Sequence, residues 1–469
     1  MLFNSVSFLL FFPIVLCLYY LVPTSRMKTL LLCVASFYFY MSCNPNYGLL
    51  LFITVLVTYG TGCFIGSKNK RKWVFTAGVL YNIVLLLFYK YVNFISENLS
   101  SLFQVIGLRF NPSDLNIILP MGISFFTFKA ISYLVDVYKG EIQPEKNFAV
   151  LTAYLTFFPQ LLAGPIDRAA SLIPQLRKDI RFNGHVIASG FKLILWGYFL
   201  KVVFADRACI YVDTIYDNLY HHNGTSILFA AFLYSMQIYC DFAGYSLISI
   251  GCAKAMGIDV PDNFKRPYFA TSISELWKRW HISLTSWFTK YLYFSLGGNR
   301  CSRLKNYMNI LIVFLVSGLW HGAAWNYVIW GGIHGLFQII EKYLGIAKKT
   351  QMNIAERVCR IIVMFSLTSF AWIFFRMNSL EDAIYAVTKI VTSAGKPFMG
   401  RDATPALEHC ALAFLIIFIK EFLDEYYPGK FSLLSNKNVL VRYVSMVLLV
   451  VAILLLGVFD NSQFIYMQY

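Results

Sequence analysis

Long apolar segments recur along this chain, and they restrict the folds open to it more than any other feature. A segment of about 20 apolar residues can cross the hydrocarbon core of a membrane as a helix. The sequence therefore predicts an all-α polytopic membrane protein with about 11–12 transmembrane helices. The predicted segments cover residues 3–22, 29–43, 47–66, 74–95, 148–164, 187–204, 227–250, 307–320, 325–344, 358–376, 406–423 and 439–458.

The overall composition excludes a soluble globular protein. Hydrophobic residues make up 58% of the chain and charged residues 14%, whereas soluble domains carry about 25% charged residues. So few charges cannot cover the surface of a chain of 469 residues. The 18% of aromatic residues is typical of contact with lipid and of the belts at membrane interfaces.

The formal net charge of +16 predicts orientation and lipid contact rather than nucleic-acid binding. Arg26, Lys28 and the run 68–72 lie in links between apolar segments, and cytoplasmic loops are enriched in such residues. We therefore expect anionic membrane lipids as partners, no nucleic acid, and both chain termini on the extracytoplasmic side. The first apolar run lacks a basic region before it and a small-residue cleavage site after it, so we interpret it as a retained span.

Two stretches do not read as plain membrane spans. Residues 115–147 are apolar but interrupted by Pro120 and Gly122, which predicts a re-entrant or half-buried segment. Residues 272–294 place large aromatic side chains at helical spacing among basic ones, which predicts one amphipathic helix at the membrane interface. Asp241, in an otherwise apolar segment, is expected to pair with a basic residue.

Two histidines, His281 and His321, are the candidate site residues. His321 is flanked by Trp320, Gly318 and Gly322, and we expect small residues around its ring and room for a substrate. An ionisable residue at membrane depth often lines a cavity or does chemistry, but a buried histidine can equally be a hydrogen-bonded packing residue. The residues alone leave both interpretations open. The ten cysteines form no CxxC pair and no Cys/His ligand spacing, so no metal site is predicted.

Several long motifs resemble those of the membrane-bound O-acyltransferase family. Within this family they are most similar to the membrane subunits of bacterial alginate and other polysaccharide O-acetylases. The motifs are LPMGISFFTF, FFPQLLAGPIDR, QIYCDFAGYS, ELWKRWHISLTSWFTKYLYFSLGGNR and GLWHGAAWNYVIWGGIHG. The resemblance implies that family's helical fold, with transmembrane, re-entrant and interfacial helices around a central funnel or tunnel. It also implies one membrane domain over 1–469, with a catalytic core at 114–345 and C-terminal helices with an extracytoplasmic tail at 358–469.

The resemblance assigns roles to the histidines. In the family, the histidine of the GLWHG block is catalytic, which is His321 here, and the histidine of the WHISL block is its active-site partner, His281. We interpret His334 as structural. Transfer of an acyl group from a thioester to a hydroxyl needs a base for the hydroxyl proton, and a histidine can supply it near neutral pH. Our hypothesis makes His321 this base, while His281 orients the acceptor or stabilises the oxyanion.

The resemblance implies transfer of an acetyl group from cytoplasmic acetyl-CoA across the membrane for O-acetylation of an extracytoplasmic polysaccharide. This polysaccharide could be an alginate-like polymer, another exopolysaccharide or peptidoglycan. Acetyl-CoA is the donor substrate, no cofactor is predicted, and Lys278, Arg279 and Arg300 are candidate donor-binding residues. The resemblance further implies a bacterial cytoplasmic-membrane location and a periplasmic or extracellular partner, an acetyltransferase of the SGNH esterase fold.

Tyr466, in the aromatic tail, is a candidate acyl relay, and the alternative is an interfacial aromatic anchor. D-alanyl-type or other acyl transfer by the same fold stays open. So do a non-enzymatic transporter or flippase and a structural scaffold for an outer acetyltransferase.

Overall fold

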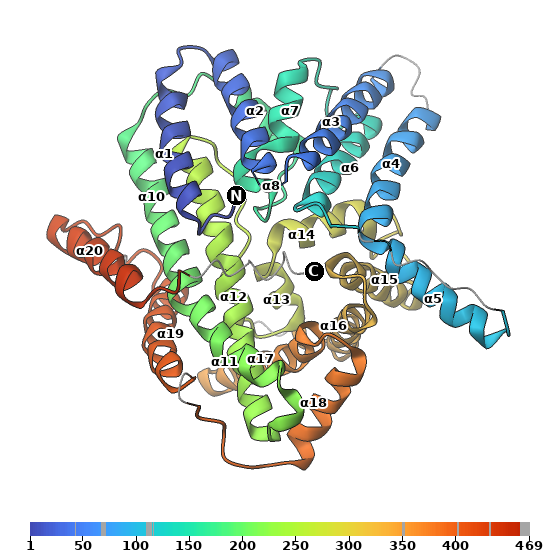
Figure 1. The fold of residues 1–469 in the computed structure, drawn as a ribbon, viewed down its shortest axis with the longest axis vertical. Helices are drawn as coiled ribbons and strands as arrows, with labels where there is room; N and C mark the ends of the chain where they lie inside the picture. Colours follow the sequence, from blue (N-terminus) through green and yellow to red (C-terminus); the bar gives the residue numbers. More distant parts are fainter. Residues whose placement is uncertain are drawn as a thin grey trace. The chain divides into compact units, whose positions relative to one another are not determined.

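The computed structural model describes residues 1–42, 44–66, 72–108, 115, 117–348, 352–400, 403–430 and 433–459 (Figure 1). All regular elements in these ranges are helices, which confirms the predicted fold class. Tyr466 and most of the basic run 68–72 lie outside the described residues. Six described helical stretches are long and apolar enough to cross a membrane: Asn46–Ile65, Lys72–Val105, Gly184–Tyr216, Gly224–Ala255, Ile354–Arg376 and Val439–Leu456.

The chain forms two compact units. The first contains Met1–Ala188, Cys252–Pro261 and Gly322–Ala324, and the second contains Ser189–Gly251, Asp262–His321 and Trp325–Tyr469. Both candidate histidines belong to the second unit.

The first unit is built from the N-terminal helices. They are α1 (Val6–Leu21), α2 (Ser25–Met41), α3 (Asn46–Ile65), α4 (Lys72–Leu86), η1 (Leu87–Tyr91), α5 (Val92–Val105), α6 (Ile123–Lys139), α7 (Phe148–Thr156), α8 (Phe158–Leu161), α9 (Ala169–Arg177) and the start of α10 (Gly184–Tyr198). Helix α2 packs beside α7 and α8, where the Ser36 hydroxyl accepts a hydrogen bond from the Phe158 N–H at 3.0 Å.

One prediction in the first unit needs correction. The expected span 148–164 is split into α7 and α8, each too short to cross a membrane, with Pro159 in the first turn of α8. The stretch 115–147, predicted as re-entrant or half-buried, is irregular over its described residues before Gly122 and continues from Ile123 as a regular, largely buried helix, α6. Gly122 permits this change because it has a φ of 73° and because a Cβ there would lie 2.2 Å from the Leu161 carbonyl oxygen.

The second unit carries the remaining helices. They are η2 (Phe199–Ala205), α11 (Asp206–Tyr216), η3 (Leu219–His221), most of α12 (Gly224–Ala255), η4 (Pro267–Phe269), α13 (Ile273–Arg279), α14 (Ile282–Trp287), η5 (Phe288–Tyr293), α15 (Arg303–His321), α16 (Trp325–Leu344), η6 (Ile346–Lys348), α17 (Ile354–Arg376), α18 (Leu380–Thr392), α19 (Ala403–Tyr426) and α20 (Val439–Leu456).

A buried ion cluster lies within the second unit. The Lys201 ammonium is 2.6 Å from a carboxylate oxygen of Asp206 and 2.6 Å from one of Asp241, and all three side chains are buried. Charged groups removed from water are stable when they pair with opposite charges. The predicted pairing of Asp241 with a basic residue is thus confirmed.

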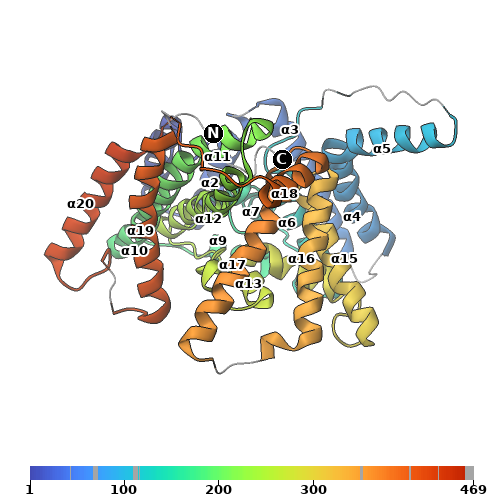
Figure 2. The same cartoon turned by 90° about the horizontal axis from the view of Figure 1, so that it is seen from below.

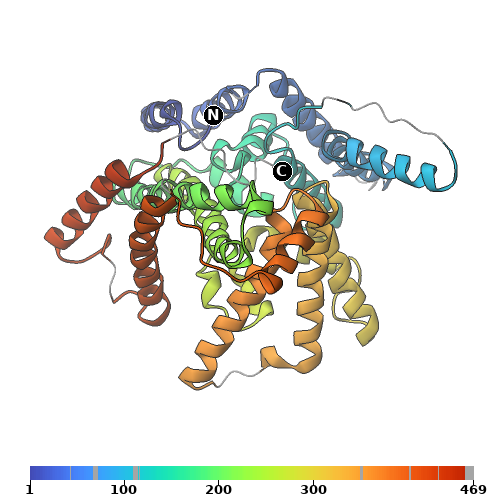
Figure 3. The ribbon, with the colours of Figure 1, turned by 60° about the horizontal axis from the view of Figure 1, so that its bottom comes forward.

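Helices α15 and α16 lie side by side as an antiparallel pair (Figure 2, Figure 3). Glycines permit this close contact. A Cβ on Gly318 would lie 2.2 Å from the Tyr327 carbonyl oxygen, and one on Gly331 would lie 2.2 Å from the Phe314 carbonyl oxygen. Small residues at a helix interface let two backbones approach closely, and here they fix the helix that ends at His321 against its neighbour.

Gly331 and Gly332 offer a matched test of this contact. A Cβ on Gly332 would meet Leu315 at an ordinary 3.5 Å. We expect Gly331→Ala to destabilise the protein by about 2 kcal/mol through overpacking. Gly332→Ala should leave the stability unchanged or slightly raised because alanine favours the helix. Thermal unfolding in detergent measures both, and equal midpoints for the two variants would contradict the close contact.

Candidate functional site

His321 is the last residue of α15, and its side chain is buried. Its ring packs edge-on against Trp330, with ring centroids 5.0 Å apart, and against Trp320 at 4.8 Å and Phe375 at 5.4 Å. The expectation that small residues surround this ring is therefore wrong. Gly318, three residues before it, serves the helix contact, and aromatic rings from α15, α16 and α17 form the walls around the imidazole.

His281 lies in a break between two short helices. Its φ of 42° places it in the left-handed region between α13 and α14. The single amphipathic helix predicted over 272–294 is thus wrong, because the chain turns at His281 and continues as α14 and η5. Left-handed backbone is costly for residues other than glycine and is often found at functional sites.

The structure brings both histidines to the same aromatic side chain. The Trp320 ring centroid lies 6.1 Å from that of His281 and 4.8 Å from that of His321. Residues 40 positions apart in the sequence therefore share one buried neighbourhood. Two imidazole rings in one buried neighbourhood could supply a base and a second polar group near it.

Asn263 is a site residue that sequence reasoning missed. It is buried, and its Oδ1 lies 3.0 Å from the His281 Nδ1. Burial lowers the pKa of His281, which lies outside the six candidate spans, so the imidazole is neutral near pH 7. Nothing in the sequence alone singles out this asparagine, which stands in an irregular link 18 residues before the histidine.

His334 lies further along α16 in an aromatic environment. It is buried, and its ring centroid is 5.1 Å from those of Trp277 and Trp330. The contact with Trp330 connects His334 to the wall of the His321 neighbourhood. Its structural role stays a prediction.

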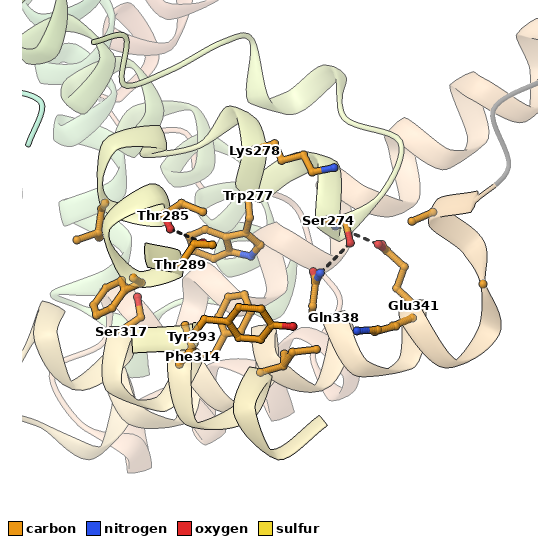
Figure 4. Close-up of a pocket in the computed structure, with 17 residues that line it drawn as sticks. Ser274, Trp277, Lys278, Thr285, Thr289, Tyr293, Phe314, Ser317, Gln338 and Glu341 are labelled. Atoms are coloured by element: carbon orange, nitrogen blue, oxygen red, sulfur yellow. Dashed lines mark hydrogen bonds between the residues drawn. The ribbon is translucent and has the colours of Figure 1, made fainter. Parts of the chain in front are cut away.

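A cavity of about 430 Å³ is lined by residues about one helical turn from each histidine, although neither histidine is itself a lining residue. One end is lined by Ser317, one helical turn before His321, and by Leu284 and Thr285, three and four residues after His281. Residues at these spacings are neighbours on a helix. Figure 4 shows Ser317 and Thr285 at one end of this cavity and Ser274, Gln338 and Glu341 at the other.

Hydrogen bonds brace the far end of this first cavity. The Gln338 side-chain amide donates to the Ser274 hydroxyl at 2.7 Å (Figure 4). The Glu341 carboxylate accepts hydrogen bonds from the backbone N–H groups of Ile273 and Ser274, and the Lys342 ammonium donates to the Asn306 side-chain oxygen. The carboxylate of α16 therefore satisfies the first N–H groups of α13 and fixes that helix beside the cavity.

A second, polar cavity of about 380 Å³ adjoins the first and shares Ser274, Lys278 and Ala347 with it. Its charged lining residues are Lys278, Arg279, Arg357, Arg360, Glu275 and Glu425.

Ion pairs hold part of this charged wall. Arg279 contacts Glu275 at 2.6 Å and Glu425 at 2.9 Å. Burial would raise the pKa of Glu275, but hydrogen bonds from Thr271 and the charge of Arg279 lower it overall, so this carboxylate is ionised near neutral pH. Because four basic residues face two acidic ones, the second cavity favours an anion.

The predicted donor-binding residues fall in different places. Lys278 and Arg279 line the second cavity, whereas Arg300 is exposed and lines neither of the two cavities. Arg357 and Arg360, from α17, were not predicted. They lie about 80 residues further along the chain than Lys278, and no local pattern connects the two segments.

The Glu341 contact predicts a stability effect. Glu341→Ala leaves two N–H groups of α13 without their acceptor, which should cost about 3 kcal/mol because a charged group accepts both bonds. Thermal unfolding in detergent measures the change. Glu408→Ala, at an exposed position on α19, is the control and should change stability by less than about 0.5 kcal/mol. Similar small effects of both variants would contradict the bracing role.

Comparisons with known proteins are consistent across the chain. The model of the membrane-bound O-acyltransferase family matches residues 146–378. A probable alginate O-acetylase of Pseudomonas aeruginosa is 38% identical, over 82% of this chain and 73% of that protein. A peptidoglycan O-acetyltransferase of Helicobacter pylori is 30% identical, over 93% of this chain and 90% of that protein. A teichoic acid D-alanyltransferase of Bacillus subtilis is 29% identical, over 55% of this chain and 69% of that protein.

Proposed function

The chain belongs to the membrane-bound O-acyltransferase family, and from this premise we propose that it takes acetyl groups from cytoplasmic acetyl-CoA and supplies them for the O-acetylation of an extracytoplasmic polysaccharide. The observation that carries the proposal is the burial of His281 and His321 against one tryptophan, with a cavity that begins one helical turn from each. The polysaccharide class in this proposal comes from two relatives, one named as an alginate O-acetylase and one as a peptidoglycan O-acetyltransferase. Both relatives match most of the chain.

The chemistry requires two proton transfers and one exchange of bonds. His321 takes the proton of the acceptor hydroxyl as its oxygen attacks the thioester carbonyl. The new C–O bond forms, the C–S bond breaks, and the CoA thiolate leaves and receives a proton. His281 either orients the acceptor hydroxyl or stabilises the oxyanion of the intermediate.

The two adjoining cavities fit the two parts of the donor. The first is mainly apolar and ends about one helical turn from each histidine, so it would hold the acyl-pantetheine arm. The second would hold the phosphates of CoA beside Lys278, Arg357 and Arg360. Basic residues at 342 and 348 end the α16 region, and by the positive-inside rule this end of the cavities faces the cytoplasm.

The acceptor side needs further components. We place the chain in a bacterial cytoplasmic membrane with both termini outside, and we expect an extracytoplasmic acetyltransferase of the SGNH fold as partner. Tyr466 stays a candidate relay that carries the acetyl group to the outer side, although it lies outside the described residues. D-alanyl transfer is less favoured because that relative matches 55% of the chain.

The enzyme assignment is tested by CoA release from radiolabelled acetyl-CoA with purified protein in nanodiscs and a model glycan acceptor. We expect His321→Ala to reduce turnover at least about 10²-fold because the base is lost. His185→Ala, at an exposed position, is the matched control and should keep full activity. Equal rates for wild type and His321→Ala would favour a transporter or scaffold. Label that stays on the protein and is lost in Tyr466→Phe would support the relay.

The donor site is tested by a truncated substrate. Arg357→Ala should raise the KM for acetyl-CoA about 10-fold, the effect of one charge-assisted contact, and leave the KM for S-acetylpantetheine unchanged because that donor lacks the nucleotide. Arg300→Ala is measured in parallel and should change neither value. An equal rise in KM for both variants would contradict the assignment of the phosphates to the second cavity.

A further inference from the structure

Asn263 connects the two chain segments that meet at His281. It lies between α12 and η4 and is 1% exposed. Its backbone oxygen accepts a hydrogen bond from the Ile282 N–H at 2.9 Å. Its side-chain oxygen lies 3.0 Å from the His281 Nδ1 and accepts the Ser283 hydroxyl at 2.8 Å, and its Nδ2 donates to the Ser246 hydroxyl at 3.1 Å.

These contacts decide which end of the amide faces the histidine. The Ser283 backbone N–H, 3.4 Å from the Asn263 Oδ1, can only donate a hydrogen bond, so it needs an oxygen at that position. The amide nitrogen then faces Ser246. An amide oxygen accepts hydrogen bonds but cannot donate one, and therefore the His281 Nδ1 must carry the proton of this contact.

A proton on Nδ1 determines the chemistry of the other ring nitrogen. A neutral imidazole has one N–H group, so when Nδ1 is protonated Nε2 has a lone pair and accepts hydrogen bonds. Nε2 lies on the side of the ring away from Nδ1 and thus away from Asn263. In this tautomer the neutral ring has no N–H to offer to an oxyanion at Nε2.

We propose that Asn263 is a positioning residue that holds His281 as the Nδ1–H tautomer, so that the His281 Nε2 accepts a hydrogen bond from a hydroxyl group of the acceptor next to the one that attacks, while the proton of the attacking hydroxyl passes to His321. This inference rests on the proposed acyl transfer and chooses between the two roles left open for His281. His281 orients the acceptor for attack, and stabilisation of the oxyanion falls to other groups. The ligand class that fits Nε2 is therefore an acceptor with more than one hydroxyl group, such as a sugar.

The backbone supports the same geometry. The left-handed conformation of His281 would relax without restraint. Hydrogen bonds from Ile282 N–H to the Asn263 carbonyl and from Lys265 N–H to the Arg279 carbonyl, both 2.9 Å, hold the two segments together on either side of the histidine. Phe242 packs edge-on against the ring at 4.6 Å. The ring is therefore fixed in position as well as in tautomer.

Three variants test the proposal by steady-state acetyl transfer. Asn263→Ala should lower kcat at least about 10-fold and leave the KM for acetyl-CoA unchanged, because the tautomer is no longer fixed while the donor cavities are intact. Asn263→Asp should recover most of kcat, since a carboxylate also accepts the Nδ1 proton. Asn309→Ala, which removes another buried asparagine that bonds backbone carbonyls at 3.1 and 3.2 Å, should keep kcat within about twofold.

A spectroscopic measurement on the wild-type protein does not depend on the folding of a variant. In 15N solid-state NMR of histidine-labelled protein, the signals absent from His281→Gln should show a protonated Nδ1 and an unprotonated Nε2. A protonated Nε2 would overturn the proposal, as would equal loss of kcat in Asn263→Ala and Asn263→Asp. If wild type turns over no acetyl-CoA, the proposed function fails, while the NMR result still decides the tautomer.

Discussion

The removal of two imidazole rings from water is the constraint on which the rest of the site depends. A buried polar group is costly unless it has a hydrogen-bond partner, and a buried charge costs more. His281 meets this demand through Asn263 at 3.0 Å, and burial keeps its ring neutral by lowering its pKa. A neutral imidazole is the form that can accept a proton or orient a hydroxyl, so the same burial that costs stability prepares the ring for chemistry.

The architecture around the rings follows from this demand. The glycine contact between α15 and α16 lets Trp330 of one helix pack against His321 of the other. Helix α13, braced by Glu341, carries the chain to the turn at His281. The helices that enclose the histidines also line a mainly apolar cavity that adjoins a basic one. The change from an apolar lining in the first cavity to a basic lining in the second matches a thioester donor whose reactive end is apolar and whose remote end is anionic.

The sequence predicted the features that depend on composition and on contiguous motifs. Apolar segments indicated a helical membrane protein, and the blocks around His281 and His321 indicated the family, as the comparisons confirm. The turn at His281 was missed because aromatic spacing on both sides of it fits one helix. Asn263, Arg357 and Arg360 were missed because their roles come from contacts between distant segments. The aromatic walls around His321 were missed because its glycine neighbours suggested open space, whereas Gly318 serves the backbone contact with α16.

The most direct test of the account is a structure of the protein with a CoA analogue in which a methylene group replaces the thioester sulfur, so that the acetyl group cannot leave. The account predicts that the analogue's phosphates lie in the second cavity, that its pantetheine arm occupies the first, and that its carbonyl carbon lies next to His281 and His321. An analogue bound with its carbonyl away from both histidines, or no bound analogue at saturating concentration, would contradict the central claim that these cavities deliver an acyl donor to the histidine pair.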